Sequence, residues 1–167
     1  MNSKSLLRTG LITVVILANI SCDQVSKNLV RHKMYPYEMI HLFDNHILVT
    51  RVENSGAFLS VGDSLPRSIK YVLLSFLPLL AVGLGLVYVF TKPRIPARIL
   101  MGLSFVIGGG MGNLFDRITY GSVTDFLHVR FGIFQTGIFN LADVSIITGI
   151  LIILLHFLVR ENHYQSA

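Results

Sequence analysis

Apolar residues in this chain gather into four long runs instead of recurring with the period of a soluble helix or strand. The runs cover about residues 6–21, 69–90, 99–115 and 141–159. A helix needs ~20 mostly apolar residues to cross a bilayer, and each run is near that length. The pattern therefore predicts four transmembrane helices, with longer polar segments between them.

Two of those polar segments, residues 22–68 and 116–140, are predicted to lie on the outer side of the membrane. Residues 47–52 are rich in β-branched side chains and precede Asn-Ser-Gly, which indicates a strand and a turn. Residues 128–139 mix apolar residues with glycines and suggest short strands or a hairpin at the interface. We expect one domain over residues 1–167, an all-α membrane protein with a small extracytoplasmic β-element and a second outer loop.

Composition and charge support the same fold class. Hydrophobic residues make up 52% of the chain and charged residues only 14%, which excludes an ordinary soluble domain. The segments 1–8, 91–98 and 160–167 hold six lysines and arginines against one acid, Glu161. Positive charge concentrates on cytoplasmic loops, so both termini are predicted to be cytoplasmic. The net charge of +5 reflects this bias; it forms no basic face typical of nucleic-acid binding, so we expect no nucleic-acid partner.

The single cysteine, Cys22, raises a question about processing. Lys4 and Arg8, an apolar run and Ser21-Cys22 together look like a lipoprotein signal peptide. Asn19 stands where such a signal needs a small apolar residue, and cleavage would leave only three spans. We therefore interpret the first run as an uncleaved anchor. One cysteine also permits no disulfide within the chain.

Three aspartates lie close to the predicted membrane surface. Asp116 and Asp125 flank a short connection, and Asp143 opens directly into the fourth apolar run. A carboxylate near lipid is costly and usually faces a bundle interior or a water-filled cavity. If Asp125 and Asp143 approach each other, they cannot both ionise easily and would share a proton. Such a pair can hydrolyse an amide by general acid–base catalysis without a metal, with Asp143, near a helix N-terminus, as the ionised member.

Several polar residues around these acids also have structural explanations. Asp23 and Lys27, spaced i and i+4, form either a helix-end ion pair or support for the site. Asn140 and Asp143 resemble a helix capping box.

Two further groups leave the same choice open. Asp116 and Arg117 form an interfacial pair, or Arg117 offers its donors to substrate. Gly108 and Gly112 predict close helix packing better than a phosphate loop.

Five short motifs connect these residues to a known family. They are CDQVSK (22–27), ENSGAF (53–58), GGGMGNLFDR (108–117), GSVTDF (121–126) and FNLAD (139–143). With their order and the four spans, the chain resembles the bacterial lipoprotein signal peptidases (signal peptidase II), which are intramembrane aspartic proteases. One departure is Gly-Ala-Phe-Leu at 56–59, where many members have Gly-Ala-Ala-Phe.

The resemblance implies a catalytic dyad of Asp125 and Asp143. It implies supporting or substrate-facing roles for Asp23, Lys27, Asn54, Gly56, Asn113, Asp116, Arg117 and Asn140. It also implies an outer β-cradle and a mobile outer segment over the cleft. The expected reaction is removal of the signal peptide from a prolipoprotein, just before a cysteine that carries a diacylglyceryl group.

The resemblance also implies the partners, the cofactors and the location of the protein. Partners would be lipid-modified prolipoproteins and membrane lipids, with no cofactor and no metal. The chain would be a monomer in the bacterial inner membrane, with the site near its outer face.

Two other functions remain open from the residues alone. Asp116, Asp125 and Asp143 could bind magnesium in an enzyme that acts on lipid head groups. The acids could also relay protons in a transporter or membrane scaffold, although four short spans leave little room for inverted repeats. No His-x-x-x-His motif or Cys/His cluster supports a zinc site.

Overall fold

The computed structural model describes residues 3–56 and 66–165, and of residues 4, 67 and 160–165 it describes the backbone alone. The elements in chain order are α1 (Ser3–Lys33), β1 (Met39–Leu42), β2 (Ile47–Asn54), α2 (Arg67–Tyr71), the π-helical turn η2 (Val72–Phe76), α3 (Leu77–Thr91), α4 (Ala97–Tyr120), β3 (Val123–Phe131), β4 (Phe134–Gln135) and α5 (Leu141–Gln165). Within the described ranges, four helical stretches are long and apolar enough to cross a membrane: Ser5–Lys33, Ser68–Thr91, Ala97–Tyr120 and Leu141–Val159. The predicted set of four spans is confirmed by length and composition.

Two helices extend beyond the apolar runs that predicted them. α1 continues to Lys33, so the motif that was expected to begin an outer segment lies inside the helix. Residues 22–33 contain no glycine or proline, and the helix ends ahead of Pro36, which disfavours helical geometry in the preceding residue. α4 continues to Tyr120 and ends at Gly121, whose positive φ of 79° suits glycine. Asp116 and Arg117 therefore belong to the last turns of α4.

α4 is the central helix of the bundle. In its most apolar window 56% of residues are buried inside the protein, against 6–17% for the other three spans. It packs against α1, α3 and α5. A side-chain carbon at Gly108 would meet Asn19 and Ile16 of α1, whereas one at Gly102 would meet Ile153 and Gly149 of α5. The predicted role of Gly108 and Gly112 in helix packing is confirmed, because Gly112 likewise lies against Asp23 of α1.

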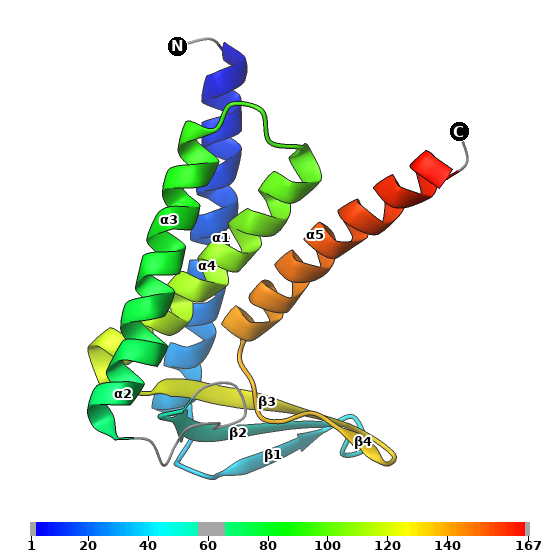
Figure 1. Ribbon diagram of the computed structural model, residues 1–167. Coiled ribbons are helices and arrows are strands. Elements are labelled where there is room, and N and C mark those ends of the chain that lie inside the picture. The colour runs from blue at the N-terminus through cyan, green and yellow to red at the C-terminus, as the bar shows by residue number, and fades with distance from the viewer. Residues whose placement is uncertain (1–2, 57–65, 166–167) are drawn as a thin grey trace.

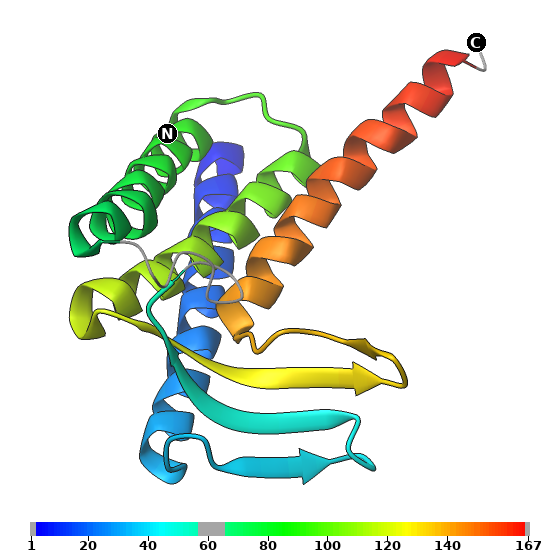
Figure 2. The same cartoon turned by 60° about the horizontal axis from the view of Figure 1, so that its bottom comes forward.

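A four-stranded antiparallel sheet in the order β1-β2-β3-β4 lies across one end of the helices (Figure 1). The predicted strand at 47–52 is confirmed as part of β2. β1 was not predicted, and β3 begins earlier than expected, so Asp125 lies inside a strand, opposite Val52 of β2. The turns that join β1 to β2 and β3 to β4 project to the side toward which α5 leans (Figures 1 and 2).

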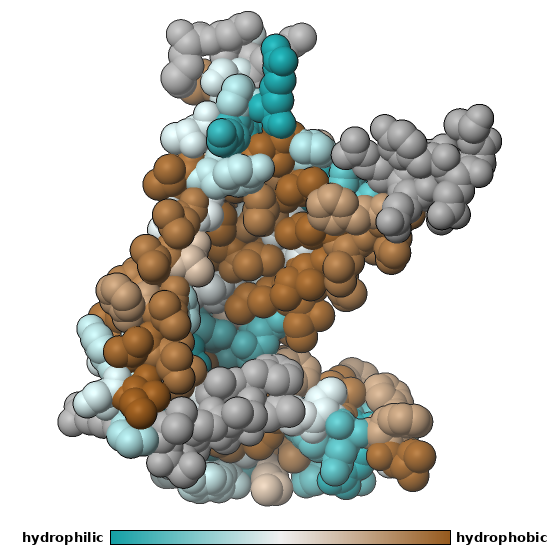
Figure 3. Space-filling model, viewed as in Figure 1, coloured by the Kyte–Doolittle hydropathy of each residue, from teal (hydrophilic) through white to brown (hydrophobic). Residues whose placement is uncertain are grey.

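Hydrophobic side chains cover the outer surface of the helices (Figure 3). Leu7, Leu84 and Leu155, for example, are exposed in the isolated chain, as residues that contact lipid would be. Both ends of the described chain lie at the end of the bundle opposite the sheet (Figure 1). There the Arg8 guanidinium donates to the backbone oxygens of Val89 and Lys92 at 2.8 and 2.7 Å, which satisfies carbonyls at the end of α3. The chain is a multi-pass membrane protein.

Candidate active site

Asp125 is a buried carboxyl group held by two amide side chains. Only 4% of the residue is exposed. Asn54, the last residue of β2, donates its Nδ2–H to Asp125 Oδ2 at 2.8 Å. Asn140, just before α5, donates its Nδ2–H to Asp125 Oδ1 at 2.7 Å. Both carboxyl oxygens therefore accept a hydrogen bond, and three separate segments of the chain determine the position of the group.

Asp143 lies in the first turn of α5 and forms the predicted capping box with Asn140. The backbone N–H of Asp143 donates to Asn140 Oδ1 at 3.0 Å, and the backbone N–H of Asn140 donates to Asp143 Oδ2 at 3.1 Å. Asn113 of α4 donates its side-chain amide to the other oxygen, Oδ1, at 2.9 Å. Asn140 thus contacts both Asp125 and Asp143, and the two sequence-distant acids share one neighbour.

Burial dominates the electrostatics of Asp125. Loss of water raises the pKa of its carboxyl to about 6, from an ordinary value of 3.8. The amide donors of Asn54 and Asn140 act in the opposite direction because they stabilise the carboxylate, whereas the nearby charge of Asp143 raises the pKa further. Asp125 is consequently easier to protonate than an ordinary aspartate.

A buried network of charges lies beneath the two acids. Lys27 Nζ contacts Asp23 Oδ2 at 2.8 Å and Asp116 Oδ2 at 3.1 Å, and all three side chains have no exposed surface. Lys27 also donates to Asn113 Oδ1 at 2.9 Å, and Asn113 in turn donates to Asp143. The predicted ion pair of Asp23 and Lys27 is confirmed, but its predicted place at a helix end is wrong, because α1 continues to Lys33 and both side chains are buried.

The other oxygen of Asp23 fixes the start of α5. The backbone N–H of Ala142 donates to Asp23 Oδ1 at 2.9 Å. This N–H belongs to the first turn of the helix and has no partner within it, and a negative charge is favourable there. The contact ties α1 to the turn of α5 that carries Asp143.

Asp116 does not have the partner that its sequence neighbour suggested. Among the ion pairs of the described residues, Asp116 binds Lys27 and Arg31, the latter at 2.9 Å. The prediction that it pairs with Arg117 is wrong because adjacent residues on a helix point in different directions. Arg117 instead donates to the backbone oxygen of Gly56 at 3.0 Å. Since both Asp116 oxygens contact cations, this carboxylate is poorly placed to bind a metal together with Asp125 and Asp143.

Gly56 belongs to a tight turn that holds Asn54 in place. Its backbone N–H donates to Asn54 Oδ1 at 2.9 Å, while Asn54 Nδ2 reaches Asp125. Arg117 contacts the same turn through the backbone oxygen of Gly56. Residues 57–59, where the sequence departs from the pattern of many members, and the segment expected to cover the cleft lie outside the described residues.

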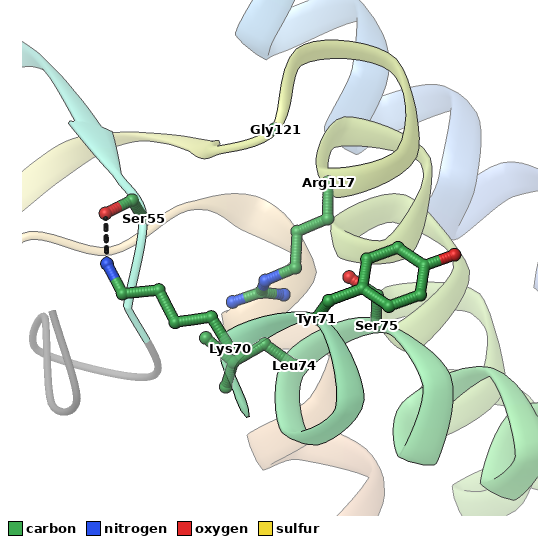
Figure 4. Close-up of a pocket in the computed structure, with 7 residues that line it drawn as sticks. All are labelled: Ser55, Lys70, Tyr71, Leu74, Ser75, Arg117 and Gly121. Carbon is green, nitrogen blue, oxygen red and sulfur yellow. Dashed lines mark hydrogen bonds between the residues drawn. The ribbon is translucent and has the colours of Figure 1, made fainter. Parts of the chain in front are cut away.

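A pocket of about 280 Å³ adjoins this turn (Figure 4). Arg117 extends into it from α4, and Lys70 of α2 reaches Ser55 Oγ at 3.0 Å. The pocket is also lined by Tyr71, Leu74, Ser75 and Gly121. Its lining includes the Arg117 guanidinium and the hydroxyl groups of Ser55 and Ser75, and Ser55 directly follows Asn54 in the chain.

Comparisons with known proteins agree with one another. The family model described as signal peptidase (SPase) II matches residues 15–159. The chain belongs to the signal peptidase II family. It is 34% identical to the lipoprotein signal peptidase of Maridesulfovibrio salexigens, over 89% of this chain and 93% of that protein. It is 35% identical to the lipoprotein signal peptidase of Gloeobacter violaceus, over 86% of this chain and 79% of that protein.

Two solved structures, both described as bacterial membrane enzymes, share the fold of this signal peptidase. The first has a TM-score of 0.81 and 19% identity and covers 92% of this chain and 91% of its own. The second has a TM-score of 0.76 and 20% identity and covers 89% and 93%. These likenesses show the fold, and family membership supports a protease that removes signal peptides from prolipoproteins.

Two residues near these acids, Gln24 and Arg31, were missed by the sequence analysis. Gln24 donates to Asp23, Asp116 and the Gly112 oxygen, each at 3.1 Å. Arg31 contacts Asp116, donates to Thr124 Oγ1 at 2.8 Å and lies 4.1 Å from the ring centroid of Tyr120. For Arg31, the available signal was the i, i+4, i+8 spacing of residues 23, 27 and 31, which places them on one helix face. It went unnoticed because the first helix was expected to end at residue 21.

Proposed function

We propose that Asp125 and Asp143 form an aspartic catalytic dyad that cleaves prolipoproteins just before the lipid-modified cysteine. The observation that carries this proposal is the double contact of Asn140. Its side chain donates to Asp125, and its backbone donates to Asp143. Asn140 thereby connects Asp125 of β3 with Asp143 of α5.

Their environments suggest different roles. Asp125 is more buried than Asp143 and has a pKa raised to about 6, so we assign it as the member that is protonated in the active form. Asp143 stands at a helix N-terminus, where negative charge is favourable, and takes a proton from the attacking water. The water oxygen adds to the amide carbonyl carbon while Asp125 donates to the carbonyl oxygen.

Collapse of that intermediate completes the reaction. Asp143 passes its proton to the cysteine nitrogen as the carbon–nitrogen bond breaks. Asp125 takes back a proton from a hydroxyl group of the intermediate as the carboxyl group of the signal peptide forms. The products are a signal peptide with a new carboxylate and a lipoprotein with a free amino group on its lipidated cysteine. No covalent bond to the enzyme is required.

The remaining residues of the predicted set are proposed to position the dyad or the substrate. Asn113 links Asp143 to the buried charges of Lys27, Asp23 and Asp116. Arg117 and the pocket beside it present donors to the carbonyl groups of the peptide. Gly56 and Asn54 orient Asp125.

We further propose that the protein is a monomer in the bacterial inner membrane. Both termini would be cytoplasmic and the sheet would lie at the outer face. Positive charge in the terminal and 91–98 segments supports that orientation. Lipid-modified prolipoproteins and membrane lipids are the partners proposed.

Purified protein in lipid vesicles, incubated with a diacylglyceryl-modified prolipoprotein, tests the proposal. The wild type is expected to shorten the precursor, while Asp125→Asn and Asp143→Asn each lose activity because neither can complete the proton transfers. Asp44→Asn is the matched control, since Asp44 is an exposed acid in the β1–β2 turn with a φ of 51°, which asparagine tolerates. Residual turnover in either dyad variant comparable to that of the control would refute the dyad.

The same assay addresses the magnesium alternative. Full activity in excess chelator is expected, because Asp116 is engaged by Lys27 and Arg31. Loss of activity in chelator, restored by magnesium, would favour the metal-dependent enzyme instead.

A further inference from the structure

The sheet has two chemically different faces that follow from its register. Directly opposed residues of antiparallel strands share a face, and alternate residues of one strand share a face. On β3 this places Asp125, Leu127, Val129 and Phe131 together. Their partners on one side are Val52, Val49 and Ile47 of β2, and the next strand adds Ile40 and Leu42. Phe134 of β4, opposite Phe131, completes a face that is apolar apart from Asp125 and its neighbour Asn54.

The other face is polar toward the end of the sheet. His41, Leu48 and His128 stand in one row across β1, β2 and β3. Arg130 is paired with Gln135. With Asn45, residues of this row and Arg130 line a hollow of about 240 Å³.

Much of the apolar face is exposed in the described part of the chain. We call Ile40, Leu42, Ile47, Val129, Phe131 and Phe134 the apolar sheet face. Phe131 is 60% exposed and Phe134 is 76% exposed. The turns beside them add Ile133, at 92%, and Phe43. An apolar surface of this kind is rare on a protein face that meets water and indicates an interaction site.

The position of this surface selects its partner. The end of the sheet projects to the side toward which α5 leans (Figures 1 and 2), and hydrophobic side chains gather there below α5 (Figure 3). The adjoining part of α5 exposes Val144, Ile147 and Leu151, which face lipid in a membrane-spanning helix. The bilayer beside α5 therefore ends next to the apolar sheet face. Aromatic side chains are also the residues that favour the membrane–water interface.

We propose that the apolar sheet face, with Phe131 and Phe134 at its end, lies in the interface of the outer lipid leaflet, with His41, His128 and Arg130 turned toward water. Phe131 is fixed for this contact because its ring stacks on His46 at a centroid distance of 5.0 Å. Asp125 is buried but lies on the same side of β3 as Phe131, so the lipid contact also sets the depth of β3 relative to the membrane surface. The inference does not depend on the proposed function, because it concerns lipid contact without substrate.

Single tryptophans provide the test, since the chain contains none. Phe134→Trp places the reporter on the apolar sheet face, and Gln135→Trp places it on the opposite face of the same strand. Ile150→Trp, on the exposed surface of α5, is the control for contact with lipid. Each variant is reconstituted in vesicles without substrate. Emission is then quenched either by lipids brominated near the headgroup end of their chains or by iodide in the water.

We expect brominated lipid to remove most of the Phe134→Trp emission, and iodide to act mainly on Gln135→Trp. The proposal would be overturned if iodide quenched the emission of the Phe134→Trp variant as strongly as that of the Gln135→Trp variant and brominated lipid had little effect on it. Protection of Phe134→Trp from both quenchers would also overturn it, because protein, such as a second copy, would then cover the face. Retained prolipoprotein cleavage by Phe134→Trp would show that the variant is folded.

Discussion

At the scale of residues, the proposed site depends on the hydrogen-bond donors that surround Asp125 and Asp143. Four N–H donors supply the two carboxyl groups, and Asn140 provides two of them. Asn54 and Asn113 provide the others. Amides suit this task because they stabilise a carboxylate by hydrogen bonds without adding a positive charge that would fix both acids in the ionised form.

The raised pKa of Asp125 leads to a prediction about pH. Below about 6 the carboxyl is mostly protonated and can donate, and above it the carboxylate predominates. The value of kcat/KM is therefore expected to fall as pH rises through this region. Asn54→Ala removes a donor that stabilises the carboxylate, so the pKa of Asp125 rises and the alkaline limb should move to higher pH. The measurement is kcat/KM against pH.

Asn28→Ala provides the control for that profile, because Asn28 is an exposed residue of α1. Its alkaline limb should coincide with that of the wild type. If the alkaline limb of the kcat/KM profile did not move in Asn54→Ala, or moved to lower pH, the proposed assignment of Asp125 as the proton donor would be contradicted.

The buried cation Lys27 gives a prediction about stability. Lys27→Met leaves Asp23 and Asp116 without their shared partner, and removing one member of a buried ion pair typically costs about 3–5 kcal/mol. Lys33→Met changes an exposed lysine in the last turn of the same helix, where the loss should be about 0.3–1 kcal/mol. Thermal unfolding in one detergent compares them. Equal losses in the two variants would show that the buried network contributes little.

At the scale of elements, α4 determines how the site is assembled. Its glycines allow α1 to approach on one side and α5 on the other, and both neighbours carry groups that meet at Asn113. A helix spacing set by backbone contact leaves little freedom for the two ends to shift. The distance between α4 and α5 therefore controls the contact between Asn113 and Asp143.

Gly149→Ala tests that dependence. The added methyl would meet the backbone oxygen of Gly102 and lie 2.9 Å from the backbone N of Val106, so α5 must move away. Overpacking of this kind costs about 1–3 kcal/mol, and activity should fall with stability because Asp143 moves with α5. Gly83→Ala on α3, which would contact nothing within 4 Å, is expected to be neutral or to stabilise its helix by about 0.5–1 kcal/mol.

Unfolding temperature and cleavage rate should be measured for both glycine variants. A Gly149→Ala protein as active and stable as Gly83→Ala would mean that the α4–α5 spacing is not set at this contact.

At the scale of the whole molecule, the helical bundle and the sheet contribute different parts of the proposed site. The helices provide the membrane anchorage and bury the charged network, whereas the sheet supplies Asp125 and Asn54 from outside the spans. Joining the two layers places one member of the proposed dyad on a strand and the other on a helix. The site consequently exists only where the sheet meets the bundle.

The orientation of the molecule can be tested by labelling in intact cells. In a Cys22→Ser background, Gln135→Cys on β4 should react with a membrane-impermeant maleimide. Lys92→Cys, at the end of α3 opposite the sheet, should react only after the membrane is permeabilised, because the excess of positive charge retains that end inside. The reverse pattern would invert the proposed topology.

Much of the molecule was accessible from its sequence because lipid imposes simple rules. Four apolar runs predicted four helices, since a spanning segment must satisfy its own backbone hydrogen bonds. The capping box of Asn140 and Asp143 was also predictable, because it depends on residues only three apart. The end of α1 was not, since residues 22–33 are too polar to read as a span and become helical through burial against α4.

The sequence by itself determined the four spans, the family to which the chain belongs, and the acids worth examining. Only the tertiary structure decided how those acids are used. Asp116 turned out to bind Lys27 and Arg31 of α1, and Asp125 turned out to lie on a strand beside Asn54. The physical reason is that spans and caps depend on neighbours along the chain, whereas the partner of a buried charge is whichever group the packing of distant segments brings within reach.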